Sequence, residues 1–557
     1  MADGVAAKKD SSSASDTVGR VLQTYEKART DRGIWERHWE DVAQVVLPYY
    51  STSFFSMGNM VPGQERGQNQ FDVTANVALF RFAAAMESML TPRNGLWHRI
   101  RLNDKALLKS RRVQLWCDQV NDALFYYRYA PAANFSSQQH DGYVGIGAFG
   151  TSCLFIDSQQ GGRGLRYRNV HLGEVFLAEN HQGIVDKLTR RFKMTIRQIA
   201  QKWGEDQLPD QLKGRLQTAP ETQVFVIHHV EPRTNWDQGR IDAKAMRFAS
   251  YYVVEDTRSL MAESGYREFP YATSRYITAP NEIYGRSPAM QVLPAIKTLN
   301  EITKTMLKQA HRAVDPVLLA HDDGVIDGFS LKPGAINAGG VNAEGRQMVQ
   351  PLPVGEMQIG QSQQQDNRQL VNDAFLVSLF QILVQSPQMT ATEVLERARE
   401  KGALLSPTMG RFQSESQGPQ ILREYNLLMR QGAIPPPPPE LIEARAEWHV
   451  EYDAPLNRAM RAEQGAGIQR TVQFAAEIAG QTQNPEVMDW FNFDAIIPDM
   501  ADISGAPFRY MNGPQTVMQL RKARQQQQET AQVTQALPGM AAMMQASTPK
   551  GDAVGQQ

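Results

Sequence analysis

Cysteine is almost missing from this chain of 557 residues, because Cys117 and Cys153 alone occur and no C-x-x-C pair is present. This scarcity argues against a disulfide framework or a thiolate zinc site and is typical of a reducing compartment. The ten histidines are scattered without H-E-x-x-H spacing. The adjacent pair His228-His229 lies in a strand-like segment, where neighbouring side chains point to opposite faces. We therefore expect no metal site.

Long apolar runs and an excess of one charge are lacking as well. No uninterrupted apolar run approaches the roughly 20 residues of a membrane span, and the opening MADGVAAKKDSSSASD has no apolar core of a secretory signal. Lys and Arg number 58 against 59 Asp and Glu, for a net charge of −1. This balance does not predict a tight nucleic-acid or membrane binder. We expect no membrane partner.

Signatures of catalysis are also scarce. The sequence contains no G-x-x-x-x-G-K-[ST] loop and no G-x-S-x-G elbow. GIGAFG (145–150) matches G-x-G-x-x-G, but that motif needs a strand before it and a helix after it. Here helix-like SSQQHDGYV precedes it and strand-like SCLFID follows. We interpret it as a tight helix-to-strand turn where two backbones approach closely, and expect no catalytic residue and no cofactor.

The periodicity that is present predicts an α+β, mainly α, protein with three or more structural units. We expect residues 1–16 to be disordered and a helix to run from Thr17 to Pro48. Further helices are predicted at 73–90, 104–127 and within 134–144. Residues 150–280 are β-rich, with strands at 151–157, 184–194, 223–230 and 247–256, and one short helix at Thr195–Trp203 capped by Thr195.

The clearest predicted helix covers residues 287–314. Ser287 is suited to its N-cap, Pro288 to its first position, and Asp315-Pro316 ends it. One side is an apolar stripe that includes Val292, Ile296, Leu299 and Met306. The polar positions include Lys297, Lys304, Lys308 and Arg312. A solvated face is the simple interpretation of these cations, and a face lining something in an assembly is the alternative.

The second half of the chain is more segmented. A Gly/Pro/Asn-rich stretch at 316–360 is followed by an apolar helix at 366–384, which breaks at Ser386-Pro387. Thr390 and Glu393 form a capping box that restarts a helix. Gly402, Pro407 and Gly418-Pro419 interrupt this helix and should kink or segment it. PPPPP (435–439) is a stiff spacer. Helices are predicted near 456–478 and 514–528, and a disordered tail follows.

Four blocks in order carry a resemblance to a known family. They are FDVTANVALFRFAAAMESMLTPRNGLWHRIRL (71–102), NEIYGRSPAMQVLPAIKTLNEI (281–302), MTATEVLERAREKGALLSPTMGRFQSE (389–415), and APLNRAMRAEQ (454–464) followed by GPQTVMQLRKAR (513–524). The chain resembles the portal (head-to-tail connecting) proteins of short-tailed bacteriophages. The blocks span nearly the whole chain, and the tail after Gln525 departs from the family pattern.

The resemblance implies a ring-forming portal fold with wing, stem, clip and crown regions. In this sequence they correspond to a wing at 17–285, a first stem helix at 286–315, a clip at 316–360, a second stem helix at 361–385, a tunnel loop at 386–390, a wing return at 391–453, crown helices at 454–530 and a tail at 531–557. The stem packing would use Val292, Ile296, Leu299 and Met306. Lys297, Lys304, Lys308 and Arg312 are the candidates for the face toward the channel.

The resemblance also implies partners and a place. They are eleven further copies in a dodecamer, double-stranded DNA in the channel, the terminase large subunit, a tail adaptor, and the major capsid and scaffolding proteins. The location would be the virion's portal vertex, after assembly in the host cytoplasm. The tunnel loop with its flanking residue, formed by Gln385, Ser386, Pro387, Gln388, Met389 and Thr390, would act as a valve on DNA. The alternatives are another ring-forming virion or scaffold protein and, less favoured, a nucleotide-dependent enzyme using residues 145–150.

Overall fold

The computed structural model describes residues 11–51, 54, 63–93, 95–104, 107, 110–237, 239–240, 242–320, 330–353, 358–377, 408–444, 447–453, 455–503, 510–513 and 515–528. The chain forms two compact units. The larger contains residues 1–99, 123–434 and 450–460, and the smaller contains residues 100–122, 435–449 and 461–557. The boundary between the two units at residues 434 and 435 therefore coincides with the start of the polyproline run 435–439. Among the described ranges, no helix is long and apolar enough to cross a membrane.

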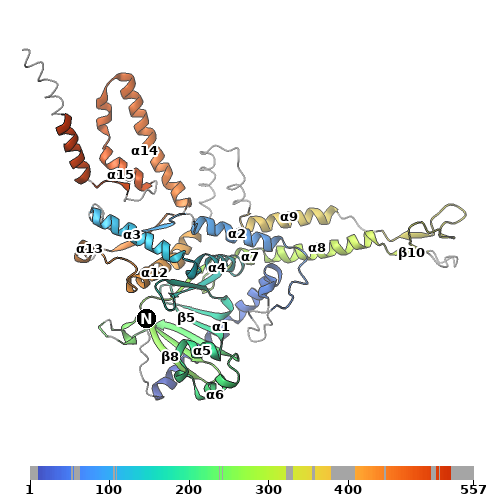
Figure 1. Cartoon of the computed structure of the whole chain (residues 1–557). Helices are drawn as coiled ribbons and strands as arrows, with labels where there is room; N and C mark the ends of the chain where they lie inside the picture. The colour runs from blue at the N-terminus through green and yellow to red at the C-terminus, as the bar shows by residue number, and fades with distance from the viewer. Residues whose placement is uncertain are drawn as a thin grey trace, which may run out of the picture. The chain divides into compact units, whose positions relative to one another are not determined.

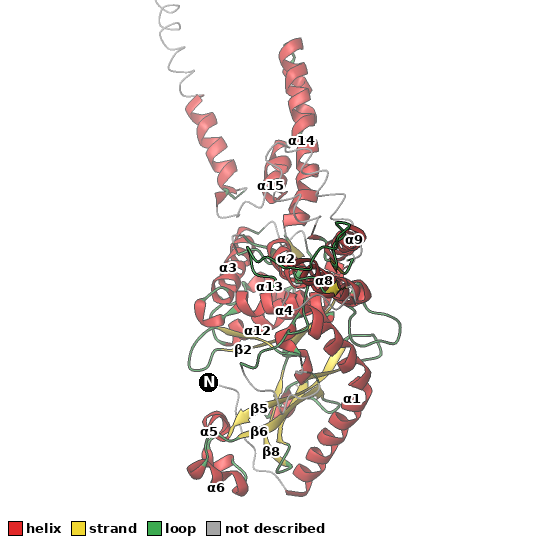
Figure 2. Cartoon of the chain, turned by 90° about the vertical axis from the view of Figure 1, so that its right-hand side faces the viewer, coloured by secondary structure: helices red, strands yellow, loops and turns green. Residues whose placement is uncertain are grey.

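A five-stranded antiparallel sheet is the centre of one part of the larger unit. Its strands follow chain order as β4 (Val175–Glu179), β5 (Val185–Thr195), β6 (Gln223–Pro232), β7 (Phe248–Val254) and β8 (Ser259–Tyr266). The strands predicted at 184–194, 223–230 and 247–256 are confirmed. Because side chains alternate between faces, the sheet has two sides to cover. Helix α1 (Ser11–Val46) covers one side, and α5 (Ile196–Trp203) with α6 (Asp210–Thr218) covers the other (Figure 2).

The predicted short helix and its cap are confirmed in detail. Thr195 accepts a hydrogen bond from the Gln198 backbone, and the Gln198 side chain accepts one from the Thr195 backbone, which is a full capping box. His228 and His229 of β6 point to opposite faces as expected. His228 lies against Tyr271 and Ser250, whereas His229 lies against Thr189, each at hydrogen-bond distance.

A second, three-stranded sheet has the order β3-β2-β9. Its strands are β3 (Leu165–Asn169), β2 (Thr151–Ser158) and β9 (Tyr271–Arg275). Helix α4 (Phe135–Phe149) packs on it, and α2 (Thr74–Leu90) and α1 pack on α4. Trp39, Leu79, Phe82 and Tyr143 are fully buried in the core that these helices share. Burial of large apolar side chains such as these is the main favourable term in folding.

GIGAFG lies mostly inside a helix. Residues 145–149 are the last turn of α4, and Gly150 ends the helix with φ of +75° before β2 begins. A Cβ on Gly150 would overlap the carbonyl oxygen of Gly285, and one on Gly147 would stand 2.5 Å from Leu79. The expected helix-to-strand turn with close backbone approach is confirmed. The helix runs five residues past the predicted Val144, and it ends only where Gly150 takes the left-handed backbone.

Other helices differ from prediction at their ends. Helix α1 starts at Ser11, inside the segment expected to be disordered, and α3 (Arg111–Arg128) starts seven residues later than predicted. The kink expected at Gly418-Pro419 is a π-helical turn, Gln413–Gln417, followed by α12 (Gly418–Arg430). Pro419 has no N–H to donate and crowds the preceding turn, and a wider turn accommodates both effects.

A fully buried ion pair lies between α3 and α12. Arg128 and Glu424 have no exposed side-chain surface. The Nε and Nη2 atoms of the Arg128 guanidinium donate hydrogen bonds to the Glu424 carboxylate. Tyr167 of β3 donates to Glu424 at 2.7 Å, and Gln420 donates to it at 2.8 Å. The guanidinium lies 4.6 Å from the ring centroid of Trp97. Burial would lower the pKa of Arg128, but the charge of Glu424 outweighs it and raises that pKa.

The smaller unit is mainly helical. Its main elements are α13 (Pro439–Glu443), most of α14 (Pro455–Thr482), α15 (Phe493–Ile503) and a helix over residues 515–528. The helices predicted near 456–478 and 514–528 are confirmed, whereas α15 was not predicted because Pro498 interrupts its sequence. Arg521 and Asp494 connect the last two helices through an exposed ion pair. The described elements also include β1 (His98–Leu102), β12 (Trp448–Tyr452) and the 3-10 turns Pro48–Tyr50, Pro131–Ala133, Leu172–Glu174, Glu205–Gln207, Ala243–Ala245 and Pro485–Trp490.

Candidate functional site

Two helices that lie side by side and a β-ribbon beyond them form the most extended feature of the larger unit (Figure 1). The first helix is split into α7 (Pro288–Gln291) and α8 (Leu293–Val314). Ser287 caps α7 by accepting from the Met290 backbone at 3.0 Å, as predicted. The single helix predicted over 287–314 is wrong at Val292, because Pro294 cannot donate the backbone hydrogen bond that would continue the helix. The predicted end before Asp315 is confirmed.

Helix α9 (Gln358–Ala374) pairs with α8. It starts eight residues before the predicted Asp366 and ends at Ala374, where Leu376 takes a left-handed backbone with φ of +57°. Gln364 donates to Thr303 at 2.9 Å, and Gly360 approaches Met306 so closely that a Cβ would overlap the sulfur. The predicted helix is therefore interrupted at Leu376, and its residues 378–384 lie outside the described residues.

The four predicted stem-packing residues are already covered by other parts of the same chain. Val292, Ile296 and Leu299 are buried within the chain, and Met306 is half-buried against α9. Their burial in the protomer does not require a neighbouring copy. Contact with a neighbour through these residues stays a prediction.

The four predicted cations differ in their partners. Lys297 pairs with Asp41 of α1 at 3.0 Å, and Lys304 lies 3.5 Å from Glu301. Lys308 and Arg312 are exposed, and neither has an ion pair with any residue in the described ranges. Lys304, Lys308 and Arg312 are spaced by four residues and therefore share one face of α8. Two of the four charges are thus balanced locally.

The ribbon beyond the helices consists of β10 (Leu318–Ala320) and β11 (Val349–Pro351), which pair antiparallel with Leu319 opposite Gln350. Several large apolar side chains on this ribbon and its connecting loop are exposed, including Val317, Leu319, Leu331 and Ile336, the last at 97%.

The sequence analysis missed the residue that ties the two helices to the rest of the unit. Asp72, just before α2, accepts from the Thr74 backbone at 2.8 Å and from Arg368 of α9 at 2.8 Å. Asn300 of α8 accepts from the Phe71 backbone at 2.7 Å. The Asp72 carboxylate therefore joins α2 to α9, and the backbone beside it is held by α8. The available signal was the spacing Asp72-x-Thr74, which is typical of a side chain that accepts from the backbone at a helix start.

The charge state of Asp72 depends on these contacts. Burial would raise the pKa of its carboxyl, but the hydrogen bonds from Thr74 and Arg368 outweigh burial and lower that pKa below its usual value. A carboxyl whose pKa is lower in the folded state stabilises the fold above its unfolded pKa. That contribution is lost as the pH falls through the folded pKa.

Replacing Asp72 by asparagine should lower the unfolding free energy at pH 7 by about 1.5 kcal/mol, the usual contribution of a hydrogen bond to a charged group. The difference from wild type should shrink on acidification toward pH 2, because protonation of the wild-type carboxyl removes the charge that accepts from Arg368. Thermal unfolding at both pH values measures this. Asp41→Asn is the matched control, since Asp41 also pairs with a helix of this site but is exposed. A difference that is equal at both pH values would contradict the role of the charge.

The predicted tunnel loop with its flanking residue, Gln385 to Thr390, lies outside the described residues, as does the capped helix start at Thr390 and Glu393. Both stay predictions. No group of three or more potential ligands that could hold a metal ion occurs in the described part of the chain.

The described part of the chain thus combines a larger α+β unit, which carries the paired helices and the ribbon, with a mainly helical smaller unit. The sequence matches the model of the family described as bacteriophage head to tail connecting protein over residues 18–511. The chain belongs to this family.

Individual relatives agree with this assignment. The chain is 29% identical over 536 residues to the probable portal protein of Bordetella phage BPP-1, with 92% of each chain covered. It is 26% identical over 526 residues to the portal protein of Salmonella phage epsilon15, again with 92% of each covered. Among solved structures, the neck of an empty gene transfer agent particle is similar at 13% identity and a TM-score of 0.34, covering 72% of this chain and 86% of that chain.

Proposed function

We propose that this head-to-tail connecting protein forms the portal ring of a phage virion, a dodecamer through whose channel double-stranded DNA enters and leaves the capsid. The observation that carries the proposal is coverage: two portal relatives match over 92% of both chains. The family model spans residues 18–511, a range that includes the helix pair and the ribbon. The ring would lie at the vertex between capsid and tail and assemble in the host cytoplasm.

In this proposal α7, α8 and α9 form the stem, and the ribbon β10–β11 belongs to the clip at 316–360. Residues 17–285 and 391–453 form the wing, and residues 454–530 form the crown. Large apolar side chains remain exposed on the helix pair in the protomer: Leu307 at 46%, Ile359 at 64% and Leu370 at 51%. Neighbouring stems in a ring would cover such groups, which supports packing of copies side by side.

The charge distribution suits a channel that releases DNA. Each phosphate contact with a cation releases counterions and adds affinity, so many such contacts would hold the duplex in place. Asp41 and Glu301 balance Lys297 and Lys304, which leaves Lys308 and Arg312 as the channel-facing candidates with no local carboxylate partner among the described residues. A lining with few free cations lets the duplex slide. The valve at 385–390 would add a steric grip without adding phosphate contacts.

The exposed apolar groups of the ribbon region support docking of other proteins at the clip. We propose that the terminase large subunit docks there during packaging and that the tail adaptor replaces it afterwards. The major capsid and scaffolding proteins would contact the wing. The energy for packaging would come from the terminase, since the sequence has no P-loop.

Electron microscopy of the purified protein along its symmetry axis tests the proposal. We expect a mushroom-shaped ring with twelve subunits and an axial hole. Another ring-forming virion or scaffold protein would give a ring without a stem, and filaments or monomers only would contradict a portal. The Gly-rich motif behind the enzyme alternative lacks the strand before it and the helix after it, because GIGAF ends helix α4 and a strand follows it.

A further inference from the structure

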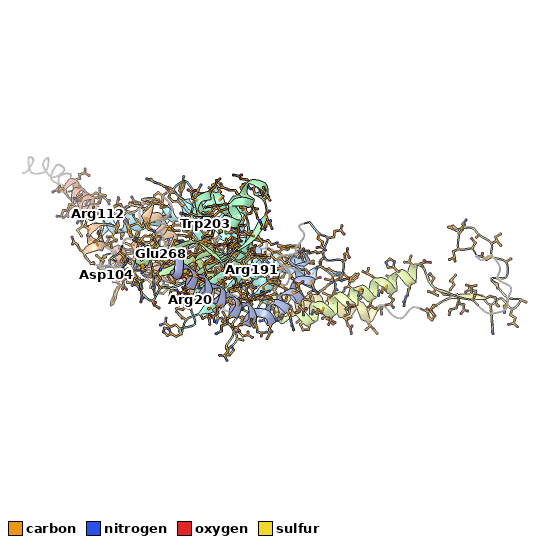
Figure 3. All side chains as sticks on the ribbon, turned by 90° about the horizontal axis from the view of Figure 1, so that it is seen from below. Arg20, Asp104, Arg112, Arg191, Trp203 and Glu268 are labelled. Atoms are coloured by element: carbon orange, nitrogen blue, oxygen red, sulfur yellow. The ribbon has the colours of Figure 1, made fainter. Side chains whose placement is uncertain are left out.

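Helices α8 and α9 contact each other along one side only, which leaves an outer face on each helix. Thr303 of α8 accepts from Gln364 of α9 at 2.9 Å, and Met306 lies against Gly360. Side chains on the far side of each helix point away from these contacts. Figure 3 shows side chains standing out along the helix pair, away from the labelled Arg191 of the five-stranded sheet. The pair therefore has two outer faces that point in opposite directions.

The outer face of α8 is basic. Lys297, Lys304 and Lys308 follow one another at spacings of seven and four residues, which places them on the side away from Thr303 and Met306. The first two have an acidic neighbour within the chain. Lys308 is exposed and has no ion pair with any residue in the described ranges. Three long aliphatic stems with cationic ends therefore form this face.

The outer face of α9 is apolar and acidic. Ile359, Asp366 and Leu370 recur at the same spacings of seven and four residues, on the side away from α8. Ile359 and Leu370 are each more than half exposed. The Asp366 carboxylate is exposed and has no hydrogen bond or ion pair to any residue that the structure describes. A complementary surface would offer aliphatic stems to the apolar groups and a cation to the carboxylate.

The heights of these residues along the helices also match. The two helices run antiparallel, and the contact of Thr303 with Gln364 marks one common height. Lys308 lies five residues beyond Thr303, and Ile359 lies five residues before Gln364. Both helices rise equally per residue, so Lys308 and Ile359 share a height.

The same count, taken in the other direction, relates the remaining residues. Lys297 and Leu370 are each six residues from the common height and are therefore level. Asp366 is level with Glu301, about 4.5 Å of helix rise from Lys304. A lysine ammonium extends far enough along the helix to cover this distance. In a ring whose axis runs along the helices, rotation keeps each height, so these residues of neighbouring copies would meet.

We propose that the lysine face of α8 in one protomer packs on the Ile359–Leu370 face of α9 in the next protomer. The inference rests on the proposed ring and specifies which surfaces join its subunits. The stems of Lys308 and Lys297 cover Ile359 and Leu370, and the Lys304 ammonium pairs with Asp366. Two different faces that complement each other join copies head to tail, and such contacts can close into a ring. A two-fold contact would place like charges together instead, which is unfavourable.

This contact gives two of the lysines a role other than lining the channel. Lys304 and Lys308 then face a neighbouring subunit. Arg312 lies one turn beyond Lys308, past the height at which α9 starts, and remains a candidate for the channel. The two roles of the lysines are separated by the experiments that follow.

Cysteine crosslinking of the full-length protein tests the contact, because the chain's own Cys117 and Cys153 are buried. Lys304→Cys combined with Asp366→Cys should give, with a short bismaleimide, a ladder of covalent multimers up to the full ring on a denaturing gel. Either single variant should stay monomeric, because a head-to-tail contact joins two different sites. Arg312→Cys with Asp366→Cys is the matched control. It should give no ladder, since the two heights differ by about 16 Å.

A charge exchange measures the electrostatic part of the contact. Asp366→Lys should raise the protein concentration needed for half-assembly at least about tenfold, because the new lysine opposes Lys304 at each interface. Lys304→Glu added to this variant should restore assembly to near the wild-type level. Light scattering coupled to size exclusion measures the assembled fraction.

The outcomes separate this contact from the ring itself. Wild-type rings without a ladder in the double cysteine variant, and with no effect of the charge exchange, would overturn the contact and leave the portal ring unaffected. That is the result expected if the lysines line the channel. Crosslinked dimers from a single cysteine variant would also overturn it, since they require a two-fold contact. A wild-type protein that forms no ring would contradict the proposed function and this inference together.

Discussion

Replacing Glu424 by glutamine should lower the unfolding free energy of the larger unit by about 3–5 kcal/mol, the usual cost of removing one partner of a buried ion pair. The Arg128 guanidinium has no exposed surface, so its charge would stay buried without a counter-charge. Tyr167 and Gln420 would also lose the carboxylate that accepts their hydrogen bonds. Urea denaturation followed by tryptophan fluorescence measures the effect, because Trp97 lies against Arg128.

An exposed ion pair in the same unit provides the control. Arg197 and Glu221 are 2.6 Å apart with side chains more than half exposed. Glu221→Gln should therefore change the unfolding free energy by less than about 1 kcal/mol. Replacing both buried partners, as in Arg128→Met with Glu424→Leu, should recover much of the loss, since no charge is left unpaired. A Glu424→Gln variant as stable as Glu221→Gln would contradict the proposed contribution of the buried pair.

The second large effect is expected at Gly150, where alanine should cost about 3 kcal/mol. A left-handed backbone costs an L-residue about 1–2 kcal/mol, and overpacking adds about 1–3 kcal/mol. The new Cβ would overlap the Gly285 backbone, which lies just before the start of α7. Tyr276 donates to the Gly150 carbonyl at 2.9 Å, so neither segment can move away without losing hydrogen bonds.

Gly145→Ala, in the same hexapeptide, separates this effect from a general one of glycine replacement. Its Cβ would be 3.7 Å from the nearest atom, the Thr151 carbonyl, which is an ordinary contact. Since alanine favours a helix over glycine by about 1 kcal/mol, this variant should be as stable as wild type or more so. Differential scanning calorimetry of both variants measures the contrast. Equal melting temperatures would mean that Gly150 is not constrained as the structure indicates.

The positions of most regular elements in the larger unit could be predicted from local sequence. Ser287 and Thr195 cap helices where they were expected to, because a cap depends on residues within one turn. The apolar stripe of α8 was visible in its spacing. Its break at Val292 was also local, and Pro294 was the signal for it. The left-handed residue at Leu376, which follows α9, had no comparable signal, because leucine rarely adopts that conformation.

The candidate site was predicted only in outline. The sequence indicated a helix with four cations, but it could not show that Lys297 pairs with Asp41, 256 positions away. It also gave no indication that Asp72 joins α2 to α9, since Arg368 is 296 positions distant. Such pairs exist only after the chain has folded, because they depend on packing of elements that are remote in sequence.

By itself the sequence determined the family, the α+β class, and the absence of recognisable catalytic and thiolate-metal motifs, because these depend on residue identity and short-range spacing. Only the tertiary structure decided which charges are balanced. It buried Arg128 against Glu424, and it placed Gly147 against α2 and Gly150 against Gly285. The physical reason is that burial and electrostatic energy depend on distances in space, and distant segments are brought together only by folding.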